Sequence, residues 1–345
     1  MQRPLEDGVV NYKKLVEETL EQCVLADKVG FDYLWFVEHH FLDTFSGSSS
    51  PEVIMSALSR MTKNVRLGFG VMILPHGHPI RFAEKAAMLD HLSDGRVDVG
   101  TGRSAPYEQT GFGVDPRDSR EMWEEALQML PEMWTREEFS HEGKFWKVPE
   151  RNVLPKPLQK PHPPIRIGAT SEDTFELVGR MGYPIFINPS RVTTLLDLKP
   201  LVAEFHQARE KAGHTGQVDV GLRVPVYVAE TKEKAYSEPK ERTMFQMQRL
   251  SNVITQSIGA AGISAGDDRA AQAKRLKAMT YEDVLANTVV YGTPESVVER
   301  LQQLREELGL TQVIYEVNFG CNVPLEHQIK AVQLINEQVA PNLKS

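Results

Sequence analysis

Residues 65–100 read VRLGFGVMILPHGHPIRFAEKAAMLDHLSDGRVDVG, which is one complete strand–helix–strand unit. Residues 65–72 have the length and apolar content of a buried strand. Pro79 opens a helical pattern that stops before Asp94 and Gly95, and a second strand is predicted at 96–100. Because a helix joins the two strands, they are expected to run parallel in an α/β sheet.

The same alternation continues along the chain. Further helices are predicted at 12–29, 51–61, 118–134, 171–182, 192–213, 294–308 and 325–339. Further strands are predicted at 31–37, 164–169, 184–187, 218–228 and 311–317. Seven strands in total are compatible with an open, doubly wound sheet, whereas eight closed strands would form a (β/α)8 TIM barrel, which needs about 250 residues.

The 345 residues exceed what a barrel needs, and two segments read as insertions. Residues 137–163 are rich in proline and aromatic residues, so they cannot form one helix. Residues 230–287 are polar, with a Gly/Ala-rich part at 258–268, and are expected to be a weakly structured lid or a disordered decoration. Residues 1–11 offer only Val9 and Val10 as a first strand, so that strand is short, or missing because the natural chain begins upstream.

Composition and charge exclude several classes of protein. The 39 basic and 47 acidic residues give a net charge of −8, which disfavours nucleic acid as a partner. Cys23 and Cys321 form no Cys-x-x-Cys pair, which indicates a reducing compartment. No apolar run approaches the length of a membrane span, and the polar start is unlike a signal peptide. We therefore expect a cytoplasmic protein with a small-molecule partner.

Polar residues follow three predicted strands at their carboxyl ends, which is the ligand-binding side of parallel α/β proteins. The first group is Glu38, His39 and His40, the second is residues 100–104 with Arg103, and the third is Thr170, Ser171 and Thr174.

The two histidines suit acid–base chemistry, because the imidazole pKa lies near neutrality. Adjacent side chains on an extended segment point to opposite sides, so His39 and His40 are poorly placed to bind one ion, and we expect no metal. The alternative is that one histidine is structural and hydrogen-bonded near Glu38.

The other two groups suit an anion. In residues 100–104, glycines permit close approach of the backbone to a ligand, and Arg103 can clamp a phosphate. A plain turn between strand and helix would look similar. At 170–174, hydroxyl groups at a helix N-terminus make an anion site, or Ser171 or Asp173 simply caps the helix.

These segments together resemble the bacterial luciferase-like flavin monooxygenases. The likeness is carried by YLWFVEHHF at 33–41, VRLGFGV at 65–71, LP at 74–75, HP at 78–79, LDHLSDGR at 89–96, GTGR at 100–103 and residues 170–174. It covers residues 24–184 well and the remainder loosely. It implies a single (β/α)8 TIM-barrel domain over 1–345 and a homodimer. The short or missing first strand departs from the family pattern.

The resemblance also implies roles for individual residues. His39 matches the catalytic histidine beside the flavin, and Glu38 matches its neighbouring acid. Gly70 and Val71 match a non-proline cis peptide against the flavin ring. The expected phosphate-binding residues are Arg103, Arg120, Thr170, Ser171 and Thr174.

The implied activity is that of an FMN-dependent monooxygenase. Reduced FMN (FMNH2) from a separate NAD(P)H–flavin reductase would react with O2 to a C4a-hydroperoxide that oxidises a small organic substrate, with an aldehyde as the default. One alternative is a coenzyme F420-dependent oxidoreductase of the same fold, which transfers hydride without oxygen. The other is a non-catalytic flavin-binding partner subunit.

Overall fold

The computed structural model describes residues 5–6, 9–42, 45–261 and 266–343. The chain divides into two compact units. The first unit comprises residues 19–166 and 253–270, and the second comprises the chain up to residue 18, residues 167–252 and the chain from residue 271.

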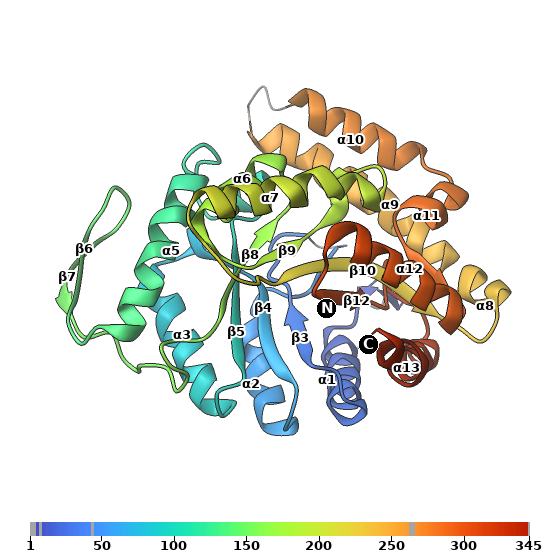
Figure 1. The fold of residues 1–345 in the computed structure, drawn as a ribbon, viewed down its shortest axis with the longest axis horizontal. Coiled ribbons are helices and arrows are strands. Elements are labelled where there is room, and N and C mark those ends of the chain that lie inside the picture. Colours follow the sequence, from blue (N-terminus) through green and yellow to red (C-terminus); the bar gives the residue numbers. More distant parts are fainter. Residues whose placement is uncertain (1–4, 7–8, 43–44, 262–265, 344–345) are drawn as a thin grey trace. The chain divides into compact units, whose positions relative to one another are not determined.

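The first unit contains three neighbouring parallel strands with helices between them (Figure 1). The strands are β3 (Tyr33–Phe36), β4 (Arg66–Ile73) and β5 (Val97–Gly102). The helices are α1 (Tyr12–Val29), whose residues up to Glu18 belong to the second unit, α2 (Pro51–Met61), α3 (Pro79–Leu92), α4 (Pro106–Gly111) and α5 (Ser119–Thr135). The predicted unit at 65–100 is therefore confirmed as β4–α3–β5.

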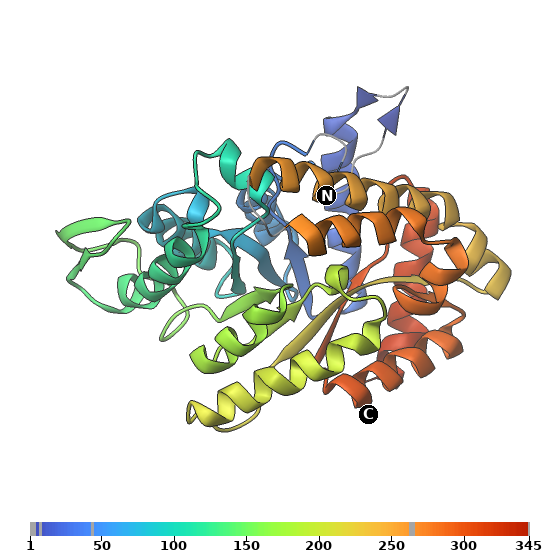
Figure 2. The ribbon, with the colours of Figure 1, turned by 90° about the horizontal axis from the view of Figure 1, so that it is seen from above.

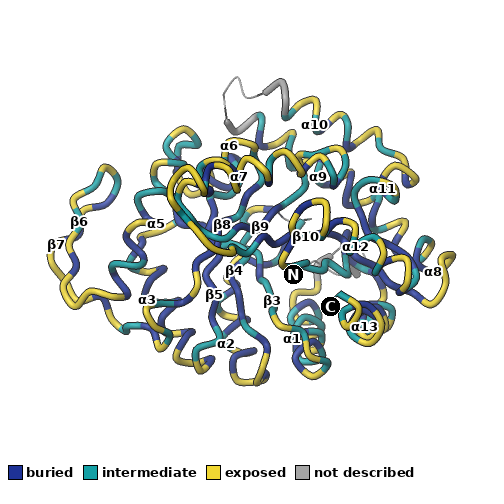
Figure 3. The backbone as a smooth tube through the Cα atoms, viewed as in Figure 1, coloured by how far each residue is buried: buried dark blue, intermediate teal, exposed yellow. Residues whose placement is uncertain are grey.

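Local chemistry explains why α3 starts and stops where it does. Pro79 occupies the first helical position, and the preceding His78 side chain accepts a hydrogen bond from the Ile80 amide at 3.3 Å. After the helix, Asp94 and Gly95 both have positive φ, at 55° and 78°, which turns the chain into β5. All six residues of β5 are buried, and Figure 3 shows its core position.

The second unit holds strands around the long strand β10. The strands are β8 (Ile165–Ala169), whose first two residues belong to the first unit, β9 (Ile185–Ile187), β10 (Val220–Val228), β11 (Val290–Gly292) and β12 (Gln312–Glu316). Strand β10 pairs in parallel with β9, β11 and β12. The helices between and after these strands are α6 (Glu172–Met181), α7 (Lys199–Lys211), α12 (Pro294–Leu308) and α13 (Leu325–Leu334).

Eight strands belong to one sheet, which has the order β11-β10-β9-β8-β5-β4-β3 with β12 beside β10. Seven of these strands match the seven predicted ones. The eighth is β11, a three-residue strand that directly follows the second insertion. It was missed because three residues carry too little periodicity to be recognised. Val9 and Val10, the only candidates for a short first barrel strand, form β2, but β2 pairs antiparallel with β1 (Leu5–Glu6) in a separate two-stranded sheet and does not belong to the eight-stranded sheet.

The first insertion forms a β-hairpin, β6 (Phe139–Glu142) and β7 (Lys147–Arg151) (Figure 2). The carboxylate of Glu125 on α5 holds its turn by accepting hydrogen bonds from the amides of Lys144, Phe145 and Trp146. Its Oε1 also lies 3.0 Å from His141 Nε2. A single partly buried carboxylate thus fixes the hairpin to its own unit.

The second insertion is helical rather than weakly structured, so that expectation was wrong. It forms α8 (Lys232–Ser237), α9 (Lys240–Ala261), α10 (Gly266–Ala278) and α11 (Tyr281–Asn287). Its Ala, Arg, Gln, Lys and Met residues are good helix formers, and their propensity outweighs the glycines. Residues 262–265, within the Gly/Ala-rich part, lie outside the described residues. No helix of the described chain is both long and apolar enough to cross a bilayer.

Asp27 links the end of α1 to the start of β4. Its buried carboxylate accepts hydrogen bonds from the amides of Lys63 at 3.0 Å and of Asn64 and Val65 at 2.8 Å each. Burial alone would raise the pKa of Asp27, but these three amides outweigh it and hold that pKa below its ordinary value.

We expect Asp27→Ala to lower the free energy of unfolding by about 2 kcal/mol at neutral pH, because three amides lose their acceptor. A carboxyl with a lowered folded-state pKa stabilises above its ordinary pKa and loses that contribution as the pH falls through the lowered value. Urea unfolding of both proteins between neutral and acid pH checks this. A stability difference that does not shrink below about pH 4 would contradict the assignment.

Candidate active site

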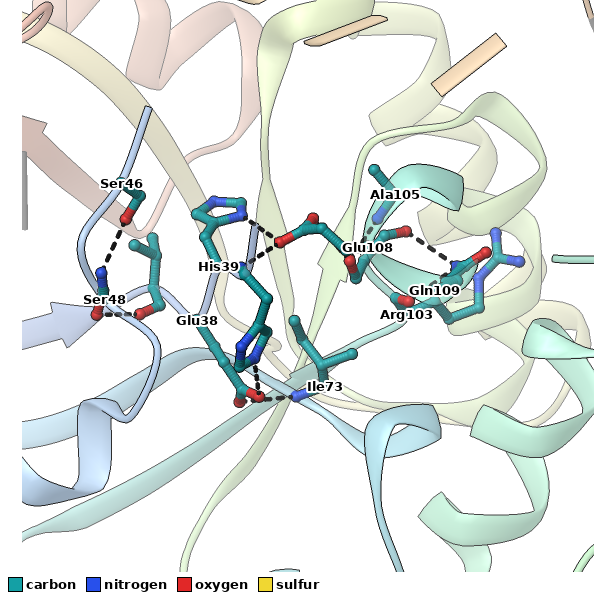
Figure 4. A network of polar contacts seen from close by, with 12 residues as sticks. Glu38, His39, Ser46, Ser48, Ile73, Arg103, Ala105, Glu108 and Gln109 are labelled. Atoms are coloured by element: carbon teal, nitrogen blue, oxygen red, sulfur yellow. Dashed lines mark hydrogen bonds and ion pairs between the residues drawn. The ribbon is translucent and has the colours of Figure 1, made fainter. Parts of the chain in front are cut away.

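The loop after β3 carries Glu38, His39 and His40 at the carboxyl end of the strand. Figure 4 shows Glu38 and His39 of this loop with their polar contacts. Its backbone is fixed by Ser48, whose carbonyl accepts from the His39 amide at 2.8 Å and whose hydroxyl donates to the Val37 carbonyl at 2.6 Å. Phe41 follows with φ 60°, a left-handed conformation that turns the chain away from the strand direction.

The two histidines point to different carboxylates, as their adjacency predicted. His39 Nδ1 lies 3.2 Å from Glu108 Oε1, and His40 Nε2 lies 3.1 Å from Glu38 Oε1. The other Glu38 oxygen accepts a hydrogen bond from the Ile73 amide at the end of β4, at 3.3 Å. His40 therefore has the partner expected of a structural histidine, whereas His39 belongs to a different pair.

Glu108, on the short helix α4, was missed by sequence reasoning. Its side chain is 1% exposed, and besides His39 it accepts hydrogen bonds from the His40 amide at 2.8 Å and the Ser104 hydroxyl at 2.7 Å. Burial would raise its pKa, but the hydrogen bond and charge of His39, with the other two donors, lower the pKa of Glu108 to about 2. At neutral pH this carboxylate is ionised, so His39 Nδ1 carries the donated proton and Nε2 is left as the basic nitrogen.

The segment after β5 is held in an uncommon backbone conformation. Strand β5 extends to Gly102, so only Arg103 and Ser104 of the predicted group at 100–104 follow the strand. Ser104 has φ 69°, and the Gln109 side chain donates to the carbonyls of Arg103 at 2.9 Å and Ser104 at 3.2 Å. These bonds offset the strain of a left-handed serine and present its hydroxyl to Glu108.

Arg103 lies beside the start of α5. Its Nη1 is 3.5 Å from the hydroxyl of Ser119, the first residue of that helix, and Arg120 is the second residue. A helix N-terminus with one arginine in its first turn and a second beside its first residue is suited to a phosphate. The structure thus brings Arg103 and the predicted Arg120 segment together within the first unit.

Gly70 and Val71 lie in the middle of β4 and are joined by a cis peptide bond, as the resemblance implied. A Cβ atom on Gly102 would lie 2.6 Å from Val71 Cγ2. Gly102 is therefore the residue on β5 that leaves space for the Val71 side chain.

The remaining predicted residues belong to the second unit. Ser171 occupies the N-cap position of α6, yet its side chain makes no capping hydrogen bond. Its hydroxyl instead lies 2.8 Å from the Thr174 hydroxyl, while Thr170 is the last residue before Ser171, and Asp173 lies within the helix. Ser171 is thus the N-cap residue by position but makes no capping hydrogen bond with its side chain. The paired hydroxyls of Ser171 and Thr174 retain capacity for a further hydrogen bond.

Comparison with known proteins identifies the family. The luciferase-like monooxygenase family matches residues 6–312. The oxygenase component of the flavin-dependent trigonelline monooxygenase of Acinetobacter baylyi is 31% identical over 68% of this chain. The match spans 65% of that relative's length, slightly less than two thirds.

Two solved structures share the fold over almost the whole chain. The oxygenating constituent of 3,6-diketocamphane monooxygenase from Pseudomonas putida, in complex with FMN, has a TM-score of 0.81 at 22% identity and covers 98% of this chain and 96% of its own. The coenzyme F420-dependent tetrahydromethanopterin reductase of Methanopyrus kandleri has a TM-score of 0.72 at 19% identity, covering 96% and 95%.

The eight-stranded parallel sheet and these neighbours confirm the predicted (β/α)8 TIM-barrel fold. The chain belongs to the luciferase-like monooxygenase family.

We expect Glu108→Ala to lower the free energy of unfolding by about 2–5 kcal/mol, because the His40 amide and two side chains lose their buried acceptor. Glu108→Gln keeps one acceptor oxygen and is the matched control, with less than half that loss. Thermal and urea unfolding measure both. Equal losses for the two variants would show that shape or charge, rather than the acceptor, holds this segment.

Proposed function

We propose that the chain is a flavin-dependent monooxygenase that uses reduced FMN and O2 to oxidise a small organic substrate. The observation that carries the proposal is the His39–Glu108 pair at the carboxyl ends of β3–β5, in a chain of this family. We further propose a separate NAD(P)H–flavin reductase as the source of reduced FMN, and a homodimer. For the organic substrate we propose an aldehyde.

The donor groups on the chain fit the phosphate of FMN. Arg103 and Arg120 flank the N-terminus of α5 and supply fixed positive charge at the end of a helix dipole. Ser171 and Thr174, preceded by Thr170, offer hydroxyl donors at the N-terminus of α6. We assign the phosphate to Arg103 and Arg120 and the flavin ring to the segment of Gly70 and Val71, all within the first unit. That Thr170, Ser171 and Thr174 of the second unit bind the phosphate stays a prediction from the sequence.

The flavin, when bound, activates O2 and transfers oxygen, which no side chain here can do. The protein's own contribution is acid–base chemistry at His39 Nε2. Glu108 accepts a hydrogen bond from the Nδ1–H of His39. As a buried anion it also stabilises the positive charge of the ring when Nε2 takes a proton. Glu38 is bonded to His40 and the Ile73 amide, so we assign it the positioning of this loop.

Coenzyme F420-dependent hydride transfer is the second candidate, because a solved F420-dependent enzyme has the same fold. The two candidates differ in their need for oxygen and in the cofactor bound. Incubation with FMN, a generic flavin reductase, NAD(P)H and a panel of aldehydes and ketones under ¹⁸O2 separates them. Labelled product supports the monooxygenase, whereas unlabelled product formed anaerobically with reduced F420 supports the alternative.

His39→Ala should reduce product formation by at least about 100-fold, because the residue that moves the proton is lost. Its affinity for FMN should stay close to that of the wild type, since His39 has no part in the proposed phosphate site. Single-turnover product yield and flavin fluorescence titration measure the two quantities. Unchanged turnover would remove His39 from the reaction and favour a non-catalytic flavin-binding subunit.

Arg103→Ala should weaken FMN binding by about 10- to 100-fold, because the loss of one charge-assisted hydrogen bond lowers the binding free energy by the corresponding amount. Arg117→Ala is the matched control. Arg117 lies in the same segment, but its exposed guanidinium pairs with Asp115. Fluorescence titration compares both variants with the wild type. Equal weakening would indicate general electrostatic attraction instead of a clamp at Arg103.

A further inference from the structure

His76 lies at the end of the short 3-10 helix that follows β4 (Leu74–His76). Its ring stacks on Phe112 with centroids 4.3 Å apart and meets the edge of the His40 ring at 5.6 Å. Both of its ring nitrogens are buried, and neither has a hydrogen-bond partner among the described residues. Two buried ring nitrogens without a partner cost free energy, and a bound ligand would remove that cost.

The same nitrogens lie close to two further donors. One donor atom each from Glu38, His40 and His76 falls within 4.8 Å of the others. Of these, Glu38 Oε1 and His40 Nε2 are 3.1 Å apart. Ligands about 2.0–2.2 Å from a tetrahedral zinc ion lie about 3.3–3.6 Å from one another. The Glu38–His40 pair lies slightly closer than this spacing because the two side chains share a hydrogen bond, and a His76 ring nitrogen lies within 4.8 Å of both donor atoms.

The donor types select the class of ion. Two imidazoles and one carboxylate suit borderline divalent transition metals, whereas Mg²⁺ and Ca²⁺ prefer oxygen donors alone. Glu108, whose carboxylate accepts the His40 amide hydrogen bond, adds a second negative charge nearby. Two carboxylates would balance the charge of a divalent cation.

We propose that Glu38, His40 and His76 form a binding site for a divalent transition-metal ion of the zinc class. This site is distinct from the His39–Glu108 pair, because the two adjacent histidines point to different partners. The proposal does not depend on the flavin chemistry above. It revises the expectation of no metal, which considered only His39 and His40.

Surrounding groups hold the three donors in place. The Ile73 amide donates to the second Glu38 oxygen at 3.3 Å, and Figure 4 shows this contact from the end of β4. Phe112 packs against both imidazoles, edge-on to His40 at 4.7 Å and stacked on His76. Ordered outer contacts of this kind fix ligand orientation in metal sites.

The first unit also supplies a matched control. His141 and Glu125 form another histidine–carboxylate pair, with His141 Nε2 3.0 Å from Glu125 Oε1. Neither residue belongs to a group of three such donors in the part of the chain that the structure describes. His141→Ala therefore removes a histidine next to a carboxylate without touching the proposed site.

The test is a zinc titration of the full, untagged, metal-free chain without flavin, in competition with a chromophoric chelator. We expect one Zn²⁺ per chain, weakened at least about 10-fold in His76→Ala and unchanged in His141→Ala. His76→Gln repeats the test with a bulkier side chain, and thermal unfolding confirms that each variant is folded. Co²⁺ in place of Zn²⁺ should give visible absorption that His76→Ala loses.

Two results would overturn the proposal. One is that the wild type binds no Zn²⁺ more tightly than His76→Ala. The other is that zinc binding is lost equally in His141→Ala, which would point to diffuse surface histidines. Neither result bears on the flavin proposal, because no flavin, oxygen or substrate is present in the titration.

Discussion

The buried carboxylate of Glu108 accepts hydrogen bonds from the His40 amide, the Ser104 hydroxyl and the His39 ring. Those donors belong to the loops after β3 and β5, so one side chain joins the carboxyl ends of two strands. An ionised carboxylate that is 1% exposed is costly unless all its donors are present. Its presence therefore makes the conformation of both loops, and the tautomer of His39, depend on a single group.

The two loops that Glu108 joins direct their side chains toward different partners. The loop after β3 sends His39 toward Glu108 and His40 toward Glu38, so adjacent residues belong to two separate hydrogen-bonded pairs. The turn after β5 sends Ser104 toward Glu108 and places Arg103 beside the start of α5. The proposed acid–base chemistry and phosphate binding would thereby rest on short segments whose backbones are fixed by hydrogen bonds, which is what positioning of a cofactor requires.

Much of this arrangement was predictable from sequence. The βαβ alternation, seven strands and the groups at 38–40, 103 and 170–174 follow from periodicity and from position after a strand. Strand β11 and Glu108 do not, because a three-residue strand and a single acid on the six-residue helix α4 carry no periodic signal. The helical second insertion was misjudged from its glycines, and His76 acquires its neighbours only through the tertiary fold.

The central claim is that one end of the first unit holds FMN between Arg103 and His39. A crystal structure of the chain with FMN bound tests it most directly. We predict the phosphate within hydrogen-bond distance of Arg103 at the N-terminus of α5, and the ring beside Gly70, Val71 and His39. A phosphate bound away from Arg103, or a ring on the far side of β4 from His39, would contradict the account.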